Sequence, residues 1–237
     1  MNNQTKKCLL CNNNVEQWTA YSNGRANCAC PHCRCAERHR LAALYLNNLD
    51  TNFNSLLHIA PERHLHKKLK SVSNNYVAGD IDPSRYPDRD TVYLDVTNIN
   101  YDHGTFDCIY ASHVLEHVID DTKAMTEMYN VLTTNGKLLV MVPQKMTLEK
   151  TYEDSTIVTE SDRLKHFGQK DHVRLYGLDF TTRLKQSGFH VEIFYASSMR
   201  EKIIENMYYD DKHKLTSDDD AIKFGFPYTL LYVCTKN

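Results

Sequence analysis

Hydrophobic positions follow two spacings from residue 55 onward. Short apolar runs that predict strands are separated by stretches in which apolar residues recur every three or four positions, as amphipathic helices require. The predicted strands cover 55–59, 76–80, 91–95, 106–110, 137–142, 190–195 and 228–234. The predicted helices cover 37–49, 61–72, 121–132 and 177–186. Strands that alternate with helices favour an α/β fold, in which helices cover both faces of a mainly parallel sheet.

Two stretches interrupt this alternation, and the N-terminal segment does not share it. Residues 144–176 and 199–225 fit no strand-helix rhythm, and the first is rich in His, Asp and Arg, which indicates a functional loop. Residues 1–36 are rich in Asn and Cys and show neither period. We therefore expect a small knuckle over 1–36, followed by one α/β domain over 37–237 that carries both insertions.

The composition is that of a soluble globular protein, with 41% hydrophobic and 24% charged residues. A formal net charge of -2 argues against a protein whose main task is to grip phosphate backbones. The basic run Arg38-His39-Arg40 is interpreted as a solvated helix face. No stretch approaches the roughly 20 apolar residues that span a bilayer, and the polar start has no signal-peptide core. We therefore expect a cytoplasmic protein without membrane insertion.

Cysteines crowd the N-terminal segment, where six of the eight lie between positions 8 and 35. They include two Cys-x-x-Cys pairs separated by 18 residues, a spacing typical of structural zinc sites. The predicted ligands of this Zn²⁺ are Cys8, Cys11, Cys30 and Cys33. Two alternatives stay open: a more cramped cluster that uses Cys28 and Cys35 with the second pair, and reduced cysteines that hold no metal.

A doubly wound sheet binds its ligand beyond the carboxyl ends of the strands. The turn after the first strand, Ala60-Pro61-Glu62, contains no glycine, which argues against a cofactor with a pyrophosphate group. Asp80 ends the second strand and is placed to accept both hydroxyls of a ribose, although Asp82 competes for this role. Asp95 follows the third strand, where it could accept a hydrogen bond from an adenine amino group.

The fourth strand leads into a turn that bears His and Glu and then into a helix. The run from Gly104-Thr105-Phe106-Asp107 through Val114-Leu115-Glu116-His117, followed by 132–136 and 137–142, resembles the class I S-adenosylmethionine-dependent methyltransferases, closest to the type-11 kind. A smaller group of methyltransferase-domain proteins is similar over nearly the whole chain. The shared motifs are the paired Cys-x-x-Cys, Glu37-Arg38-His39-Arg40, Ala60-Pro61-Glu62, Tyr152-Glu153-Asp154 and Phe167-Gly168-Gln169-x-Asp171-His172-Val173-Arg174-x-Tyr176-Gly177.

The resemblance implies a Rossmann-like sheet of about seven strands, with the last strand antiparallel, and S-adenosylmethionine as cofactor. By position, Ala60, Pro61 and Glu62 stand where the family has its glycine-rich motif. The resemblance further assigns the ribose position to Asp80 and Ile81, the adenine edge to Asp95 and Val96, and the methionine portion to His113. His58 stands where many relatives have an acid, so both His58 and the turn without glycine depart from the family pattern.

Transfer of a methyl group is an in-line displacement that depends on alignment, which is worth roughly 7–11 kcal/mol, and on removal of a proton from the acceptor. His172 is the predicted base, and Asp171 either orients it or takes the proton itself. Arg174 is the predicted clamp for an anionic substrate. The alternative is that residues 171–174 only pin a lid through hydrogen bonds.

The predicted function is methyl transfer to an O or N atom of a small molecule or glycan. One alternative is a ribosomal RNA base methyltransferase whose knuckle contacts RNA through Arg25, Arg34, Arg38 and Arg40; the charge balance makes a nucleic-acid partner less expected. A second alternative, motivated by the missing glycines, is a scaffold that binds the cofactor without catalysis.

Overall fold

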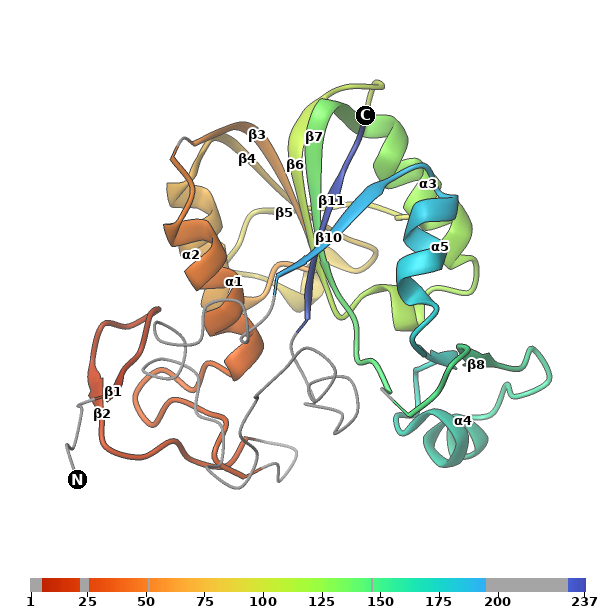
Figure 1. The fold of residues 1–237 in the computed structure, drawn as a ribbon, viewed down its shortest axis with the longest axis horizontal. Coiled ribbons are helices and arrows are strands. Elements are labelled where there is room, and N and C mark those ends of the chain that lie inside the picture. The colour runs from red at the N-terminus through yellow and green to blue at the C-terminus, as the bar shows by residue number, and fades with distance from the viewer. Residues whose placement is uncertain (1–5, 22–25, 51, 146, 195–229) are drawn as a thin grey trace.

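A sheet of seven strands forms the centre of the protein in a computed structural model that describes residues 6–21, 26–50, 52–145, 147–194 and 230–237. Figure 1 shows its twist and the helices around it. Its strands, in spatial order, are β10 (His190–Phe194), β11 (Leu231–Thr235), β7 (Leu132–Met141), β6 (Phe106–Ser112), β3 (Phe53–Ile59), β4 (Ser73–Asp80) and β5 (Thr91–Tyr93). Only β11 runs antiparallel to its neighbours within this sheet. The predicted Rossmann-like architecture with an antiparallel last strand is confirmed.

Helices cover both faces of the sheet, as the pattern predicted (Figure 1). α1 (Glu37–Asn47) and α2 (Arg63–Ser71) pack on one face, and α3 (Asp121–Val131) and α5 (Phe180–Gln186) pack on the other. Successive side chains of β6 point to opposite faces, so Tyr110 belongs to the first core and Ile109 to the second. Burial on both faces explains why β6 reads as a continuous apolar run.

The boundary between α3 and β7 differs from the prediction. Asn135-Gly136 was expected to end the helix, but β7 already begins at Leu132, and these two residues lie within the strand. The register against β6 shifts there, because Phe106 pairs with Leu132 whereas Cys108 pairs with Lys137. Asn135 has a φ of 62°, which Asn tolerates better than most residues. The Asn-Gly pair therefore forms an irregularity in the strand.

The first insertion, 144–176, contains short regular elements that the pattern did not predict. They are β8 (Tyr152–Glu153), α4 (Glu160–Phe167) and β9 (Arg174–Leu175), of which β8 and β9 pair with each other. Two single 3-10 turns, η1 (Pro83–Arg85) and η2 (Leu115–His117), follow β4 and β6. The second predicted insertion, 199–225, lies outside the described residues.

The N-terminal segment contains the short pair β1 (Lys6–Lys7) and β2 (Asn14–Val15) and has a small core of its own, which includes Trp18. The guanidinium of Arg40, which is 0% exposed, lies 3.9 Å from the centre of a Trp18 ring and donates to the carbonyl oxygens of Cys28 and Cys35. Arg40 is thus an anchor for the knuckle and not part of a solvated face. Among the described residues, no helix combines the length and apolar character needed to cross a bilayer.

Candidate active site

A cavity of about 770 Å³ lies at the carboxyl ends of β3, β4 and β6. Figure 1 shows that the knuckle and the insertion with α4 lie at the same end of the sheet. The predicted cofactor residues that line the cavity are Ala60, Glu62, Asp80, Ile81, Asp95, Val96 and His113. Pro61 is the one predicted cofactor residue outside this lining; it is buried, and its carbonyl oxygen accepts from Arg89 Nη1 at 3.1 Å. Of the predicted catalytic residues, Asp171 reaches this cavity, whereas His172 and Arg174 do not.

Asp80 ends β4 with its carboxylate 5% exposed at the cavity wall. Its Oδ1 accepts from the backbone N–H of Asp82 at 2.8 Å, and its Oδ2 accepts from Tyr86 Oη at 3.2 Å. Asp82, in contrast, uses Oδ1 to accept from Ser84 N at the start of η1 and does not line the cavity. The geometry therefore favours Asp80 over Asp82 as the ligand for a diol.

A turn without glycine follows β3, although Ala60 has a φ of 51°, in the region that favours glycine. Hydrogen bonds hold this strained turn: Ala60 N donates to Gly79 O at 2.9 Å, and Glu62 N donates to His58 Nε2 at 3.2 Å. His58 is 0% exposed, and its Nδ1 lies 2.7 Å from Tyr76 Oη. His58 thus supports the turn from behind and is absent from the lining of the cavity.

The side chain of Glu62 connects the cavity to α1. Its Oε1 accepts from Arg38 Nε at 3.2 Å and from His39 Nε2 at 2.9 Å. Burial opposes ionisation of this carboxyl, but the hydrogen bond from neutral His39 and the positive charge of Arg38 outweigh burial and hold the pKa of Glu62 well below its ordinary value. A negative charge therefore lies at the cavity wall. The basic run 38–40, which was interpreted as a solvated face, supplies the partners of this charge.

Two buried histidines must stay neutral, and this predicts a loss of stability in acid. His58 Nε2 accepts from Glu62 N, and His39 Nδ1 accepts from Ala36 N, so neither nitrogen has room for a proton. Burial lowers the pKa of His58 to about 3 and that of His39 to about 4. Below about pH 6.5 the unfolded chain takes up these protons and the folded chain does not, so stability falls as the pH drops towards the folded values.

Between about pH 7.5 and pH 5, each of these histidines should remove about 2 kcal/mol from the free energy of unfolding. Urea unfolding at both pH values measures this loss. His58→Gln should lose its share of the pH dependence, whereas His103→Gln, at an exposed position, should retain it all. Equal pH dependence in wild type and His58→Gln would contradict the assignment.

Another part of the cavity lining combines η2 with the insertion through His117 and Asp171. His113 directly follows β6 with a φ of 56°, and its Nδ1 lies 3.3 Å from Oε1 of Glu116. His117 Nε2 lies 4.0 Å from the same oxygen, while its Nδ1 faces Asp171, 3.3 Å from the carbonyl oxygen and 3.4 Å from Oδ2. His172 packs edge-on against His117, with ring centres 4.7 Å apart. His172 therefore lies behind the cavity surface, and burial lowers its pKa, partly offset by Glu116.

Arg174 is 3% exposed and binds protein groups on all sides. Its guanidinium donates to the carbonyl oxygens of Leu115 at 2.9 Å, Ile119 at 2.8 Å and Val118, and to Glu153 Oε2 at 2.8 Å. Arg174 also borders a second cavity of about 690 Å³, which shares Ile119 and Asp120 with the first. In this structure Arg174 thus holds the backbone of the turn over residues 115–119.

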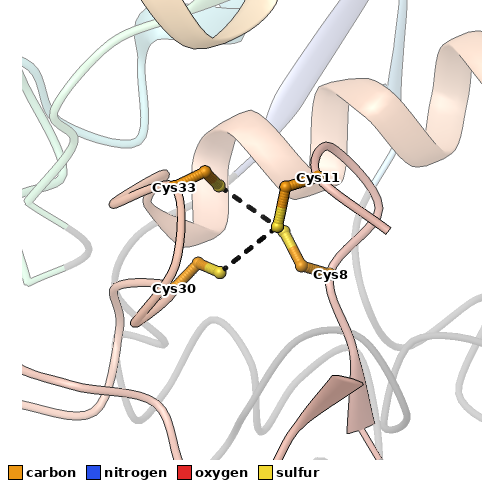
Figure 2. Close-up of side chains that lie close together, drawn as sticks. All are labelled: Cys8, Cys11, Cys30 and Cys33. Carbon is orange, nitrogen blue, oxygen red and sulfur yellow. Dashed lines mark hydrogen bonds between the residues drawn. The ribbon is translucent and has the colours of Figure 1, made fainter. Parts of the chain in front are cut away.

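Four cysteine sulfurs converge between two loops of the knuckle, as Figure 2 shows. The ligand atoms of Cys8, Cys11, Cys30 and Cys33 all lie within 4.8 Å of one another. The Cys8–Cys33 and Cys11–Cys30 sulfurs are 3.8 Å and 3.7 Å apart. A tetrahedral ion with Zn–S bonds of about 2.3 Å requires a separation of about 3.8 Å, so the four residues fit zinc. Cys35 Sγ lies 3.5 Å from Cys8 Sγ, but Cys35 is not a member of this four-cysteine group or of another ligand group within the described residues.

Residues 54–140 match the family model described as a methyltransferase domain, and this segment contains Asp80, Asp95 and His113. No curated protein sequence matches the chain significantly.

Among solved structures, the chain resembles an S-adenosylmethionine-dependent methyltransferase from Mesorhizobium loti, with TM-score 0.51, 13% identity, and coverage of 83% of this chain and 98% of the other. A 1,6-didemethyltoxoflavin-N1-methyltransferase from Burkholderia thailandensis gives TM-score 0.51, 11% identity, and coverage of 85% and 79%. Phosphoethanolamine N-methyltransferase 2 from Haemonchus contortus gives TM-score 0.50, 16% identity, and coverage of 83% and 51%. The fold is therefore the Rossmann-like methyltransferase fold.

Proposed function

We propose that the protein is an S-adenosylmethionine-dependent methyltransferase that acts on an O or N atom of a small molecule or glycan. One observation carries the proposal: the carboxylate of Asp80 and the carboxylate of Asp171 line the same cavity, beyond the carboxyl ends of the parallel strands. The carboxylate of Asp80 is suited to accept hydrogen bonds from a sugar diol, and the carboxylate of Asp171 is suited to take the proton of an acceptor. The match of 54–140 to a methyltransferase domain supports the same class of enzyme.

Residues of this chain would hold the methyl donor at three points. Asp80 accepts from the ribose hydroxyls, and Asp95 with Val96 meets the adenine edge. The ionised Glu62, next to the strained turn at Ala60, attracts the ammonium group of the methionine portion. A turn without glycine is adequate for this cofactor, because no phosphate must approach the backbone.

The part of the lining formed by η2 and the insertion would orient the acceptor and remove its proton. When bound, S-adenosylmethionine supplies the methyl group, and the protein supplies alignment. Asp171 lines the cavity, and we assign to its carboxylate the role of accepting the proton. His172 lies behind His117 and acts as a positioning residue, while Arg174 holds the backbone of the η2 turn in place.

The second cavity is our candidate for the body of the acceptor. It adjoins the first at Ile119 and Asp120 and is lined by charged side chains, among them Glu153, Arg163 and Arg183. Such a lining suits a polar acceptor with many hydroxyl groups, since each hydroxyl needs a hydrogen-bond partner.

The knuckle is proposed to hold a structural Zn²⁺ on Cys8, Cys11, Cys30 and Cys33. Its arginines do not favour the RNA alternative. Arg34 donates to Thr19 and Ala20, and Arg38 is paired with Glu62. Arg40 is buried against Trp18, and Arg25 lies outside the described residues.

Binding of the cofactor provides the direct test. S-adenosylmethionine and S-adenosylhomocysteine should each raise the melting temperature, with a stabilisation of about 2.7 kcal/mol at 100 times Kd, or roughly 5–10 °C for a chain of this size. NAD, which carries a pyrophosphate, is the control and should give no shift. The absence of a shift with saturating S-adenosylhomocysteine would contradict the proposal. A shift without methyl transfer to any acceptor would favour the scaffold alternative.

A further inference from the structure

A buried carboxylate behind the cavity wall has no adequate partner. Glu116 is 0% exposed, and neither of its carboxylate oxygens has a hydrogen-bond partner. An ionised carboxylate in such a place is unfavourable by several kcal/mol unless a charge of opposite sign compensates it. The nearest positive candidates are imidazoles, of which His113 comes closest, at 3.3 Å.

His117 is oriented in a way that increases the need for a cation. Its Nδ1 lies 3.3 Å from the carbonyl oxygen of Asp171 and 3.4 Å from Oδ2, so the proton belongs on Nδ1. Nε2 then carries a lone pair that faces Glu116, 4.0 Å away. A carboxylate that orients an imidazole through the nitrogen opposite the ligand atom is the usual outer partner of a metal-bound histidine.

His172 completes the group from the insertion. It is 3% exposed, and its Nδ1 has no hydrogen-bond partner. One ligand atom from each of Glu116, His117 and His172 lies within 4.8 Å of the other two. Glu116 and His172 are buried with polar atoms that lack hydrogen-bond partners, while His117 closes the group from the exposed, cavity side. A cation held between the three side chains would compensate the two buried groups.

We propose that Glu116, His117 and His172 bind a divalent transition-metal ion, at a site distinct from the cysteine cluster. The site lies at the wall of the first cavity, called the donor cavity below because it is proposed to hold the methyl donor. Two imidazoles and one carboxylate suit Zn²⁺, Fe²⁺ or Co²⁺ and are too rich in nitrogen for Mg²⁺ or Ca²⁺. Ligand atoms that lie about 2.1 Å from an ion are about 3.4 Å apart, so small side-chain rotations close the site.

The backbone holds the two halves of this site together. Val173 N donates to the backbone oxygen of Glu116 at 2.9 Å. Because Val173 follows His172, this bond joins the segment that carries His172 to the segment that carries Glu116 and His117. Arg174 adds hydrogen bonds to the carbonyl oxygens of Leu115 and Ile119, on either side of the turn. The dense bonding of a buried arginine to this turn is expected where ligands must be preorganised.

The site has an open side. His117 and Asp171 line the donor cavity, whereas Glu116 and His172 lie behind them. Three protein ligands leave coordination positions free, and these would face the cavity. If the proposed function holds, an acceptor hydroxyl that coordinates there loses its proton to Asp171 more readily, because the ion stabilises the resulting oxyanion. Binding of the metal itself does not depend on that role.

Titration with Co²⁺ separates this site from the cysteines. The full chain is first loaded with one equivalent of Zn²⁺, which the four thiolates take in preference to the site made of nitrogen and oxygen ligands. Wild type should then bind about one further Co²⁺ with visible d–d bands but without the intense near-ultraviolet bands of a thiolate complex. Glu116→Gln and His172→Gln should each weaken this binding at least about 100-fold and leave the zinc content unchanged.

Two controls keep the result interpretable. His103→Gln replaces an exposed histidine and should bind Co²⁺ like wild type. Glu116→Gln should melt no lower than wild type without the second metal, because it removes a buried charge. Co²⁺ should raise the melting temperature of wild type and of His103→Gln but not that of Glu116→Gln. Unchanged Co²⁺ binding in both ligand variants, or a spectrum with thiolate bands alone, would overturn the proposal.

The outcome is separable from that of the proposed function. Binding of S-adenosylhomocysteine without binding of Co²⁺ would remove the metal site and leave the methyltransferase proposal standing. Binding of Co²⁺ at Glu116 and His172 without binding of S-adenosylhomocysteine would support the metal site and contradict the methyltransferase proposal.

Discussion

Replacement of Asp80 by asparagine is expected to weaken binding of S-adenosylmethionine and S-adenosylhomocysteine by roughly 30- to 1,000-fold. The carboxylate is 5% exposed and lines the donor cavity. Hydrogen bonds to a charged group contribute about 1.5–3 kcal/mol each, and asparagine keeps the shape while it loses the charge and one acceptor. The expected loss is therefore about 2–4 kcal/mol, which isothermal titration calorimetry would measure directly.

The matched control is Asp82→Asn, only two residues away. Asp82 accepts from Ser84 N and Oγ in the η1 turn and is absent from the cavity lining. Its replacement should change the affinity no more than a few-fold, and urea unfolding of both variants would show whether the turn stays intact. A larger loss for Asp82→Asn than for Asp80→Asn would assign the ribose to Asp82 instead.

The placement of Asp80 was predictable from the sequence because it depends on local order. A buried strand that ends in a carboxylate needs only its own apolar run to be recognised, and parallel strands bring their carboxyl ends to one edge. The two Cys-x-x-Cys pairs were predictable for a similar reason, since four thiolates at that spacing have few other uses. The structure brings together the four cysteines that the spacing indicated.

Features that depend on tertiary context were not predictable in this way. Asn135-Gly136 has the composition of a helix end, yet the positive φ of Asn135 serves an irregularity within β7. Arg38 and Arg40 belong to a run that reads as a solvated face, but one arginine pairs with Glu62 and the other is covered by Trp18. A pattern of residue types cannot reveal partners that arrive from distant segments.

The wall around Glu116 shows the same limit most clearly. Glu116 and His172 lie 56 residues apart, and the insertion that carries His172 has no hydrophobic period. Sequence reasoning placed His172 at the acceptor as a base. The structure places it behind His117, beside a carboxylate whose oxygens lack hydrogen-bond partners. Glu116, a glutamate in the turn after a strand, was a visible feature of the sequence. Its proximity to His172 became apparent only from the position of the insertion in the structure.

Replacement of Cys30 by serine is expected to abolish zinc binding and to unfold the N-terminal segment. The buried core of this segment consists of Val15, Trp18 and cysteines, so little apolar surface remains once the ion is lost. Structural zinc supplies about 10–16 kcal/mol in small zinc domains, far more than such a core. Metal analysis and limited proteolysis of the variant would show the loss, and a chelator should reproduce it in wild type.

The effect of Cys30→Ser should extend to the donor cavity through α1. Arg40 joins Trp18 to this helix, and Arg38 and His39, two residues and one residue before it, hold the carboxylate of Glu62 at the cavity wall. We therefore expect the variant to bind S-adenosylhomocysteine about tenfold more weakly, the equivalent of one charged hydrogen bond. Cys28→Ser is the control, because Cys28 is buried in the same segment but outside the ligand group, and it should retain zinc. Normal zinc content in Cys30→Ser, or loss of zinc in Cys28→Ser, would show that the ligand set is different.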